Sequence, residues 1–284
     1  MYVKNYGWLA MVAAFAVGCG GDAGDANDGM DGGMDDDMAD AAPAVDPAVA
    51  ATINGTITFA GTPPAGEPID MSEEPVCADK HDDQPMMRHV VTEGNGGGLA
   101  NVFVHVKDGL GEMTFPTARE PVEIDQEGCE YSPHVLGIQT GQNLVIHNSD
   151  AVLHNINTQG QANRSFNISQ PQEGMESTRT FNAPEVMIPV KCDVHGWMNA
   201  YIGVTASPYH AVTGEDGSFT IEGLPAGTYT IEAWHETLGA QTMSVTVGES
   251  ETGTADFSYN ENAAYAPVPM GDPIVLSHEG HVAG

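Results

Sequence analysis

Three side chains that bind soft metal ions stand close together in the sequence, at Cys192, His195 and Met198. A thiolate and a thioether favour Cu(I), whereas an imidazole also accepts Cu(II). This mixture of donors suits a site that tolerates both oxidation states of one metal. A short β-type run at 186–190 precedes the three residues, so the end of a strand would hold them together. The spacing therefore predicts a soft, redox-tolerant metal site.

Three other chemistries fit this segment less well. A structural zinc site would need a second Cys/His pair at finger spacing, and methionine is a poor zinc ligand. A catalytic Cys–His pair usually comes from separate elements and needs a third group to orient it. A c-type haem would need Cys-x-x-Cys-His, which the sequence lacks.

A fourth ligand is expected upstream of this segment. A strand-like run leads into an Asn-x-Asp turn at 148–150, and His154 with Asn155 follows. This order resembles the cupredoxins, in which a His-Asn pair after such a turn supplies the first copper ligand. The aromatic-x-Pro beginning at Tyr131 also resembles that family. His147 is a competitor because it too precedes an Asn, but it lies before the turn, within the strand, where family ligands do not sit.

The resemblance to cupredoxins covers residues 120–204. The Cys-x2-His-x2-Met spacing is similar to the short ligand loop of amicyanin, and plastocyanin has a longer one. The string also resembles that of bacterial plastocyanin-like or methylamine-utilisation-like lipoproteins, with Gly196 where a Pro is usual. The resemblance implies one type 1 (blue) copper ion held by His154, Cys192, His195 and Met198.

Two functions follow from such a site. The first is one-electron transfer between redox partners, with His195 projecting near the surface and the other three ligands buried. In that case Trp197 belongs to an apolar docking patch, or it simply packs in the core. The second is copper handling by a chaperone, buffer or sensor. We expect no enzymatic activity, because a full set of four ligands leaves no open coordination position.

The elements that must position these ligands are strands. Short β-branched or alternating runs are separated by clusters of Gly, Pro, Asn and Asp. They lie at 53–59, 102–106, 136–138, 143–146, 186–190, 201–204, 218–221, 228–233 and 243–247. No window has a clean helical period, apart from a possible short helix at 73–79. The pattern predicts an all-β protein of sandwich or barrel type.

A second resemblance lies downstream of the metal-binding segment. Residues 213–229 look like the carboxypeptidase-regulatory (prealbumin-like) β-sandwich, with an Asp-Gly turn before one strand and Leu-Pro-x-Gly-x-Tyr before the next. The opening strand of that family looks like residues 53–61. We therefore expect this sandwich to comprise 51–119 and 207–260, with a cupredoxin domain inserted at 120–206. The alternative is a tandem arrangement, 51–206 followed by 207–260. Residues 261–284 are predicted to be a flexible tail.

The cysteines outside the metal-binding segment have separate predicted roles. Cys77 and Cys129 are expected to form a disulfide in an exported, oxidising setting, and the alternative is two free buried thiols. Cys19 follows an apolar run and the small residues at 16–18, which resembles a bacterial lipobox. Residues 1–18 are then a lipoprotein signal peptide, and Cys19 is the lipidated first residue of the mature chain. The alternative is an ordinary cleaved signal peptide.

The charge of the chain limits its partners. Eight Lys and Arg stand against 40 Asp and Glu, which gives a net charge of −32 and largely excludes nucleic acid as a partner. Many of the aspartates lie in residues 19–50, a low-complexity stretch that we predict to be a disordered tether. No stretch after residue 18 is apolar enough to span a bilayer. We expect a protein lipid-anchored in the cell envelope, on the outer membrane, with redox partners such as a basic cytochrome.

Other histidines carry weaker predictions. The segment beginning Met86-Met87 and ending at His89, and the pair His278 and His281, are candidates for loading or exchanging copper. Surface or hydrogen-bonded histidines and core-filling methionines are the simpler interpretation.

Overall fold

The computed structural model describes residues 45–92 and 97–260. The predicted signal peptide, Cys19, most of the predicted tether, the tail, and the pair His278 and His281 lie outside the described residues. Within the described residues, no helix has the length and apolar character needed to cross a membrane.

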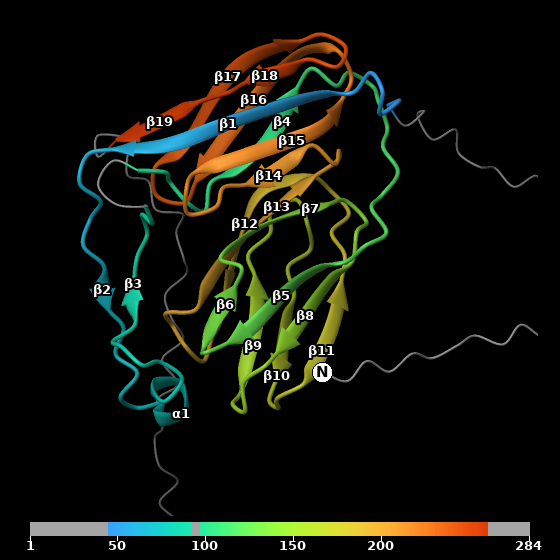
Figure 1. Cartoon of the computed structure of the whole chain (residues 1–284). Helices are drawn as coiled ribbons and strands as arrows, with labels where there is room; N and C mark the ends of the chain where they lie inside the picture. The colour runs from blue at the N-terminus through green and yellow to red at the C-terminus, as the bar shows by residue number, and fades with distance from the viewer. Residues whose placement is uncertain (1–44, 93–96, 261–284) are drawn as a thin grey trace, which may run out of the picture. The chain divides into compact units, whose positions relative to one another are not determined.

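Strands from the two ends of the described chain form one β-sandwich, here named the terminal sandwich (Figure 1). Its first sheet contains β1 (Ala51–Ala60), β15 (Ser218–Leu224), β18 (Thr252–Thr254) and β19 (Phe257–Asn260). Its second sheet contains β4 (Phe103–Asp108), β14 (His210–Val212), β16 (Gly227–His235) and β17 (Gly239–Val247). One hydrophobic core draws residues from both sheets.

Alternating side chains explain how β1 comes to lie in this sandwich. Ile53, Ile57 and Phe59 are buried, whereas residues between them are partly or fully exposed, as the two-residue period of a strand requires. β1 pairs antiparallel with β15, which begins after Gly217. Gly217 has a φ of +73°, and a Cβ there would lie 2.2 Å from the carbonyl oxygen of Ile57. Only glycine fits this turn without displacing β1.

Strands between residues 122 and 205 form the second sandwich, here named the central sandwich. One sheet contains β7 (Val135–Gln139), β9 (His154–Thr158), β10 (Asn167–Gln170), β12 (Glu185–Lys191) and β13 (Asn199–Thr205). The other contains β5 (Val122–Glu127), β6 (Glu130–Ser132), β8 (Leu144–Asn148) and β11 (Met175–Arg179). Both contribute to a separate hydrophobic core.

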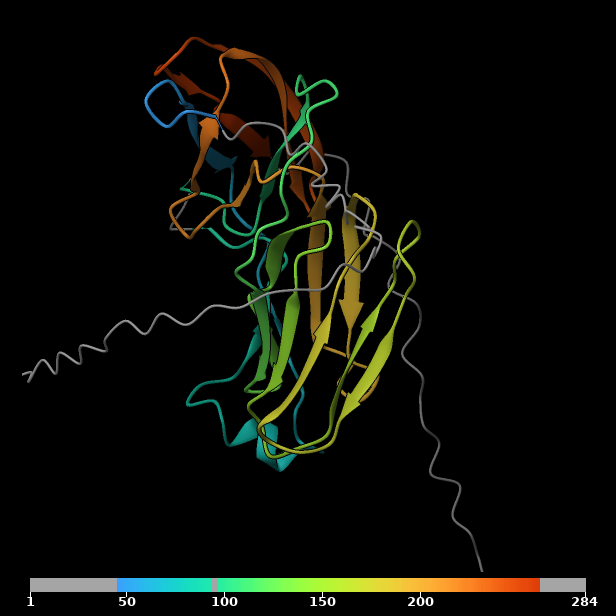
Figure 2. The same cartoon turned by 90° about the vertical axis from the view of Figure 1, so that its right-hand side faces the viewer.

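A segment between the first two strands of the terminal sandwich contacts the central sandwich instead. It contains β2 (Glu67–Pro68), α1 (Pro75–Ala78) and β3 (Met86–Met87). Ile69, Met71 and Cys77 of this segment belong to the core of the central sandwich. Figure 2 shows α1 at the end of the green and yellow strands. We name residues 67–87 the cover segment.

The predicted all-β class is confirmed, and each of the nine predicted runs overlaps a strand. The short helix expected at 73–79 is α1. A small cluster that includes Phe103 and Tyr201 joins residues of the two sandwiches. How the chain divides into domains, by insertion or in tandem, stays a prediction.

Candidate metal centre

Three of the four predicted ligands converge in the core of the central sandwich. His154 begins β9, while Cys192 and His195 lie in the loop after β12. The Nδ1 atoms of the two histidines are 3.0 Å apart, and the Cys192 Sγ is 3.9 Å from the His195 Nδ1. All three side chains are buried, and their ligand atoms lie within 4.8 Å of one another. The structure thus brings together two histidines that lie 41 residues apart in the sequence.

The loop between β12 and β13 folds back on itself through backbone hydrogen bonds. The Cys192 amide donates to the Met198 carbonyl at 3.1 Å, and the Met198 amide donates to the His195 carbonyl at 3.0 Å. The His195 amide also donates to the Cys192 sulfur at 3.4 Å. Met198 is buried in the same core cluster as Cys192. The Cys-x2-His-x2-Met spacing therefore closes a compact loop that keeps all three side chains at one end of the sandwich.

Asn155, which directly follows His154, fixes the start of the ligand loop. Its Oδ1 accepts the Asp193 amide at 2.8 Å and lies 3.4 Å from the Cys192 Sγ. The Asp193 carboxylate in turn accepts the side-chain amides of Asn157 and Asn167. Burial raises the pKa of the Cys192 thiol, although hydrogen bonds with Asn155, His195 and Val194 oppose the rise. The thiol is therefore held in place before any metal binds, and it must lose its proton when one does.

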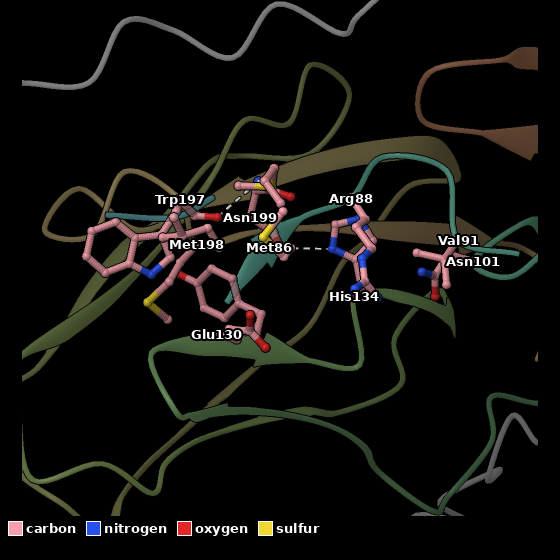
Figure 3. Close-up of a pocket in the computed structure, with 12 residues that line it drawn as sticks. Met86, Arg88, Val91, Asn101, Glu130, His134, Trp197, Met198 and Asn199 are labelled. Atoms are coloured by element: carbon pink, nitrogen blue, oxygen red, sulfur yellow. Dashed lines mark hydrogen bonds between the residues drawn. The ribbon is translucent and has the colours of Figure 1, made fainter. Parts of the chain in front are cut away.

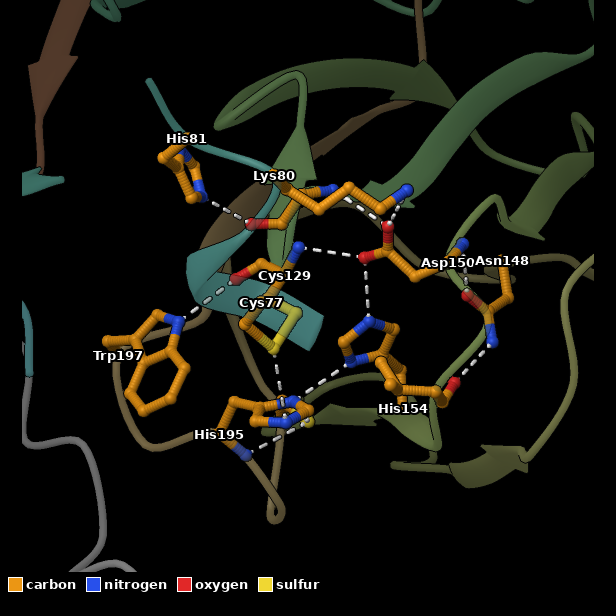
Figure 4. Close-up of a disulfide and its surroundings, with 12 residues drawn as sticks. Cys77, Lys80, His81, Cys129, Asn148, Asp150, His154, His195 and Trp197 are labelled. Atoms are coloured by element: carbon orange, nitrogen blue, oxygen red, sulfur yellow. Dashed lines mark hydrogen bonds and ion pairs between the residues drawn. A yellow bond between two sulfur atoms is a disulfide. The ribbon is translucent and has the colours of Figure 1, made fainter. Parts of the chain in front are cut away.

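Asp150 orients His154 (Figure 4). Its carboxylate lies 2.9 Å from the His154 Nε2, and it also accepts the Cys129 and Gly128 amides and pairs with Lys80. Burial alone would raise the pKa of Asp150, but these hydrogen bonds together lower it. The ionised carboxylate accepts a hydrogen bond from the His154 Nε2–H. In the neutral ring the Nδ1 then carries no proton, and its lone pair points toward His195 and Cys192.

His195 is buried, and the expectation that it projects near the surface was wrong. Its exposed fraction is 1 %. Cys77 and Cys129 form a disulfide, and the Cys77 sulfur lies 3.7 Å from the His195 Nε2. Cys77 belongs to the cover segment, which therefore contributes to this burial. Burial, followed by the proximity of His154, lowers the pKa of His195 to about 4, so the ring is neutral at pH 7.

Trp197 packs in the structure rather than standing free. Its indole Nε1 donates to the Cys129 carbonyl at 3.0 Å, and its ring centroid lies 5.2 Å from that of His195. The side chain is half-buried and also lines a cleft with Asp70, Glu73 and Val194. Trp197 thus ties the ligand loop to the disulfide while part of its ring reaches the surface.

The competing residue His147 lies away from the cluster. It is half-buried in β8, and its Nδ1 is 3.2 Å from a Glu176 oxygen. Leu144 and Ile146 of β8 are buried, so the strand alternation turns His147 to the opposite face. Of the two His-Asn pairs, the structure therefore places only the second at the candidate site.

The donor set fits a copper ion. With the His154 Nδ1 unprotonated, the facing Nδ1–H of His195 donates a hydrogen bond to it in the metal-free chain, and a cation would take the place of the shared proton. The third donor is a thiol, and a thioether-bearing residue lies in the same loop. Two imidazoles and one thiolate with a weak thioether are the ligands of type 1 copper.

Two features of the site were missed by the sequence reasoning. Asp150 was noted only as part of a turn, although its four-residue spacing from His154 was visible. The contact between the disulfide and His195 had no signal, because Cys77 lies 118 residues from His195.

Residues 198–260 match the family model of the carboxypeptidase regulatory-like domain. The matched residues run from the end of the ligand loop to β19. No curated protein matches the chain.

Several solved structures resemble part of the chain. A Cu-containing nitrite reductase from Thermus scotoductus SA-01 is 21 % identical over 33 % of this chain and 24 % of that one, with a TM-score of 0.30. The chain thus spans about a quarter of that enzyme. A purple cupredoxin from Nitrosopumilus maritimus is 22 % identical over 30 % and 99 %, with a TM-score of 0.26. A mutant of amicyanin in the Cu(I) form is 16 % identical over 36 % and 98 %, with a TM-score of 0.28.

Proposed function

We propose that this chain is an extracytoplasmic type 1 copper protein that carries single electrons between redox partners. The observation that carries the proposal is the buried convergence of the His154 Nδ1, the His195 Nδ1 and the Cys192 Sγ. Met198, buried in the same core, would supply the fourth ligand. When bound, copper would supply a centre that changes between Cu(I) and Cu(II).

The chain's own residues would keep that centre rigid. Asp150 fixes the tautomer of His154, and Asn155 fixes the start of the ligand loop. Both act from within a closely packed core, where side chains have little freedom to move. A site that keeps one geometry in both oxidation states needs little rearrangement when an electron arrives or leaves. This arrangement supports a carrier over a protein that releases copper.

Trp197 is the proposed exit for the electron. His195 is buried, but the Trp197 ring lies beside it and reaches a cleft lined by Asp70, Glu73 and Glu74. The acidic side chains around this cleft would attract a basic partner, such as a cytochrome, by electrostatic steering. Trp197 would therefore fill both roles considered for it, because it packs against the core and also forms part of the proposed docking surface.

The location belongs to the same proposal. The lipobox-like residues before Cys19 and the acidic stretch after it support a lipid anchor and a tether in the cell envelope, on the outer membrane. The proposed activity is not enzymatic, because the ligand set leaves no position for a substrate.

The test separates a carrier from a copper-handling protein. The full chain, loaded with one copper ion, is reduced with ascorbate and reoxidised with ferricyanide over several cycles in the presence of a Cu(I) chelator. A carrier keeps its copper and returns to the same oxidised spectrum after each cycle. Loss of the metal to the chelator after the first reduction would contradict the carrier and favour copper handling.

A further inference from the structure

Two histidines approach one buried carboxylate outside the candidate copper site. The Glu236 Oε1 lies 3.2 Å from the His134 Nε2 and 3.7 Å from the His89 Nδ1. Glu236 follows β16 in the terminal sandwich, His134 precedes β7 in the central sandwich, and His89 follows β3. Three segments distant in sequence therefore meet at one oxygen atom.

The Glu236 carboxylate has no permanent countercharge among the described residues. It is 5 % exposed, and its ion-pair partners in residues 45–92 and 97–260 are the two histidines alone. The nearby Glu232 differs, because it pairs with Lys107 as well as with His105. A buried carboxylate is costly unless a cation neutralises it, so Glu236 needs either a protonated histidine or a bound cation.

The hydrogen bonds of His134 show which nitrogen is free. Its Nδ1 lies 3.2 Å from the Asn199 carbonyl oxygen, which can only accept, so the Nδ1 carries the proton (Figure 3). In the neutral ring the Nε2 lone pair then faces the Glu236 oxygen. Two lone pairs that face each other at 3.2 Å need a positive charge between them. A second proton on His134 would supply it, and so would a metal ion.

We propose that His89, His134 and Glu236 form a second metal site, for one divalent ion of borderline softness such as Zn²⁺ or Cu²⁺. Two imidazoles and one carboxylate are ligands for such ions, with water completing the coordination. The Nδ1–H bond of His134 to a backbone carbonyl is the outer-shell contact that metal-binding histidines commonly make. The His89 side chain is 47 % exposed, so it can turn toward the ion and leaves the site open to solvent.

Surrounding residues also hold the Glu236 carboxylate and the His134 ring in place. Burial would raise the pKa of Glu236, yet the nearby His134 and His89 side chains lower it to about 2, so the carboxylate is ionised. The Tyr201 ring packs edge-on against His134, with centroids 5.7 Å apart, and fixes the ring from the side. Figure 3 shows His134 lining the same pocket as Met86 and Met198.

The experiment uses the full chain carrying Cys192→Ser, so that it does not depend on a blue-copper site. Zn²⁺ is titrated by calorimetry into this chain and into the same chain with Glu236→Gln or His89→Ala. The matched control is Glu176→Gln, which removes the carboxylate beside His147 at an equivalent distance. We expect Glu236→Gln and His89→Ala each to lower the binding affinity for one Zn²⁺ equivalent by at least about tenfold. Glu176→Gln should leave the titration unchanged.

A structural readout keeps the test decisive if a variant folds poorly. X-ray absorption at the zinc edge of the one-equivalent complex should show imidazole and carboxylate ligands, and loss of an imidazole in His89→Ala. Because His89 is partly exposed, this variant retains the core. Zn²⁺ titrations that are identical in the parent, Glu236→Gln and His89→Ala chains would overturn the proposal. A failure of the blue-copper proposal would leave these results untouched.

Discussion

At the scale of single residues, Asp150 decides how well His154 can bind a metal. The Asp150 carboxylate accepts a hydrogen bond from the His154 Nε2–H. Lys80, Gly128 and Cys129 in turn bind the carboxylate and fix its position. Replacing Asp150→Ala frees the ring and removes the acceptor. We expect copper affinity to fall by about 10- to 100-fold, measured by competition with a chelator of known affinity. Glu123→Gln, an exposed carboxylate near His147, is the control and should leave the affinity unchanged.

A second residue-scale prediction separates the two His-Asn pairs. His154→Ala removes an Nδ1 that faces His195 and Cys192, whereas His147→Ala removes a ring that pairs with Glu176 on another face. Copper-loaded His147→Ala should keep the visible spectrum of the parent, and His154→Ala should lose its intense band. The reverse result would place the first ligand at His147.

The candidate ligands could be named from residue types, whereas the surroundings of those residues could not. Cys192, His195 and Met198 follow from donor chemistry and spacing, and the face of β8 that carries His147 follows from strand alternation. The burial of His195 depends on the cover segment, which joins it through tertiary contacts. No local pattern encodes such a contact.

At the scale of elements, the cover segment and its disulfide shield the site. Cys77 and Cys129 are 52 residues apart in sequence, so the disulfide should stabilise the fold by about 4 kcal/mol on the chain-entropy estimate. The double variant Cys77→Ser with Cys129→Ser should lower the free energy of unfolding by about that amount in urea titrations. It should also speed removal of Cu(I) by a chelator, because the cover segment is no longer fixed over His195.

The two readouts of this variant have different meanings. A loss of stability with an unchanged rate of copper removal would show that the segment stays closed without the disulfide. The cover would then be held by the packing of Ile69 and Met71 alone.

At the scale of the whole molecule, buried neutral histidines make the metal-free protein sensitive to acid. Burial lowers the pKa of His195 and of His235 to about 4, and it also lowers the pKa of His210. Between about pH 6.5 and pH 4 the unfolded chain therefore binds more protons than the folded chain, and the free energy of unfolding falls as the pH falls. His195 and His235 each contribute up to about 3 kcal/mol of this loss at pH 4.

Urea titrations of the metal-free chain at several pH values across this window measure the effect. The slope of stability against pH gives the number of protons taken up on unfolding, which should exceed one near pH 5. A flat profile between pH 6.5 and pH 4 would show that these rings are not buried in the neutral form. Bound copper should delay the loss, because a metal-bound imidazole cannot accept a proton at the same nitrogen.

The sequence predicted much of the whole-molecule organisation through its turns and alternating runs. The Asp216-Gly217 turn and the alternation in β1 mark strands that do pair, although 168 positions separate the paired residues Ile53 and Ile221 in the numbering. The meeting of His89, His134 and Glu236 was not predictable, because it needs both sandwiches and the stretch of chain after β3 in place.

Visible and EPR spectra of the full chain loaded with one Cu(II), beside those of the same chain with Cys192→Ser, decide whether the site holds type 1 copper. We expect an intense thiolate-to-copper charge-transfer band and the narrow copper hyperfine splitting of a type 1 centre in the parent. Cys192→Ser should lose both, because a hydroxyl cannot replace the soft sulfur donor. A weak visible band in the parent, or an intense band that survives in Cys192→Ser, would contradict the assignment.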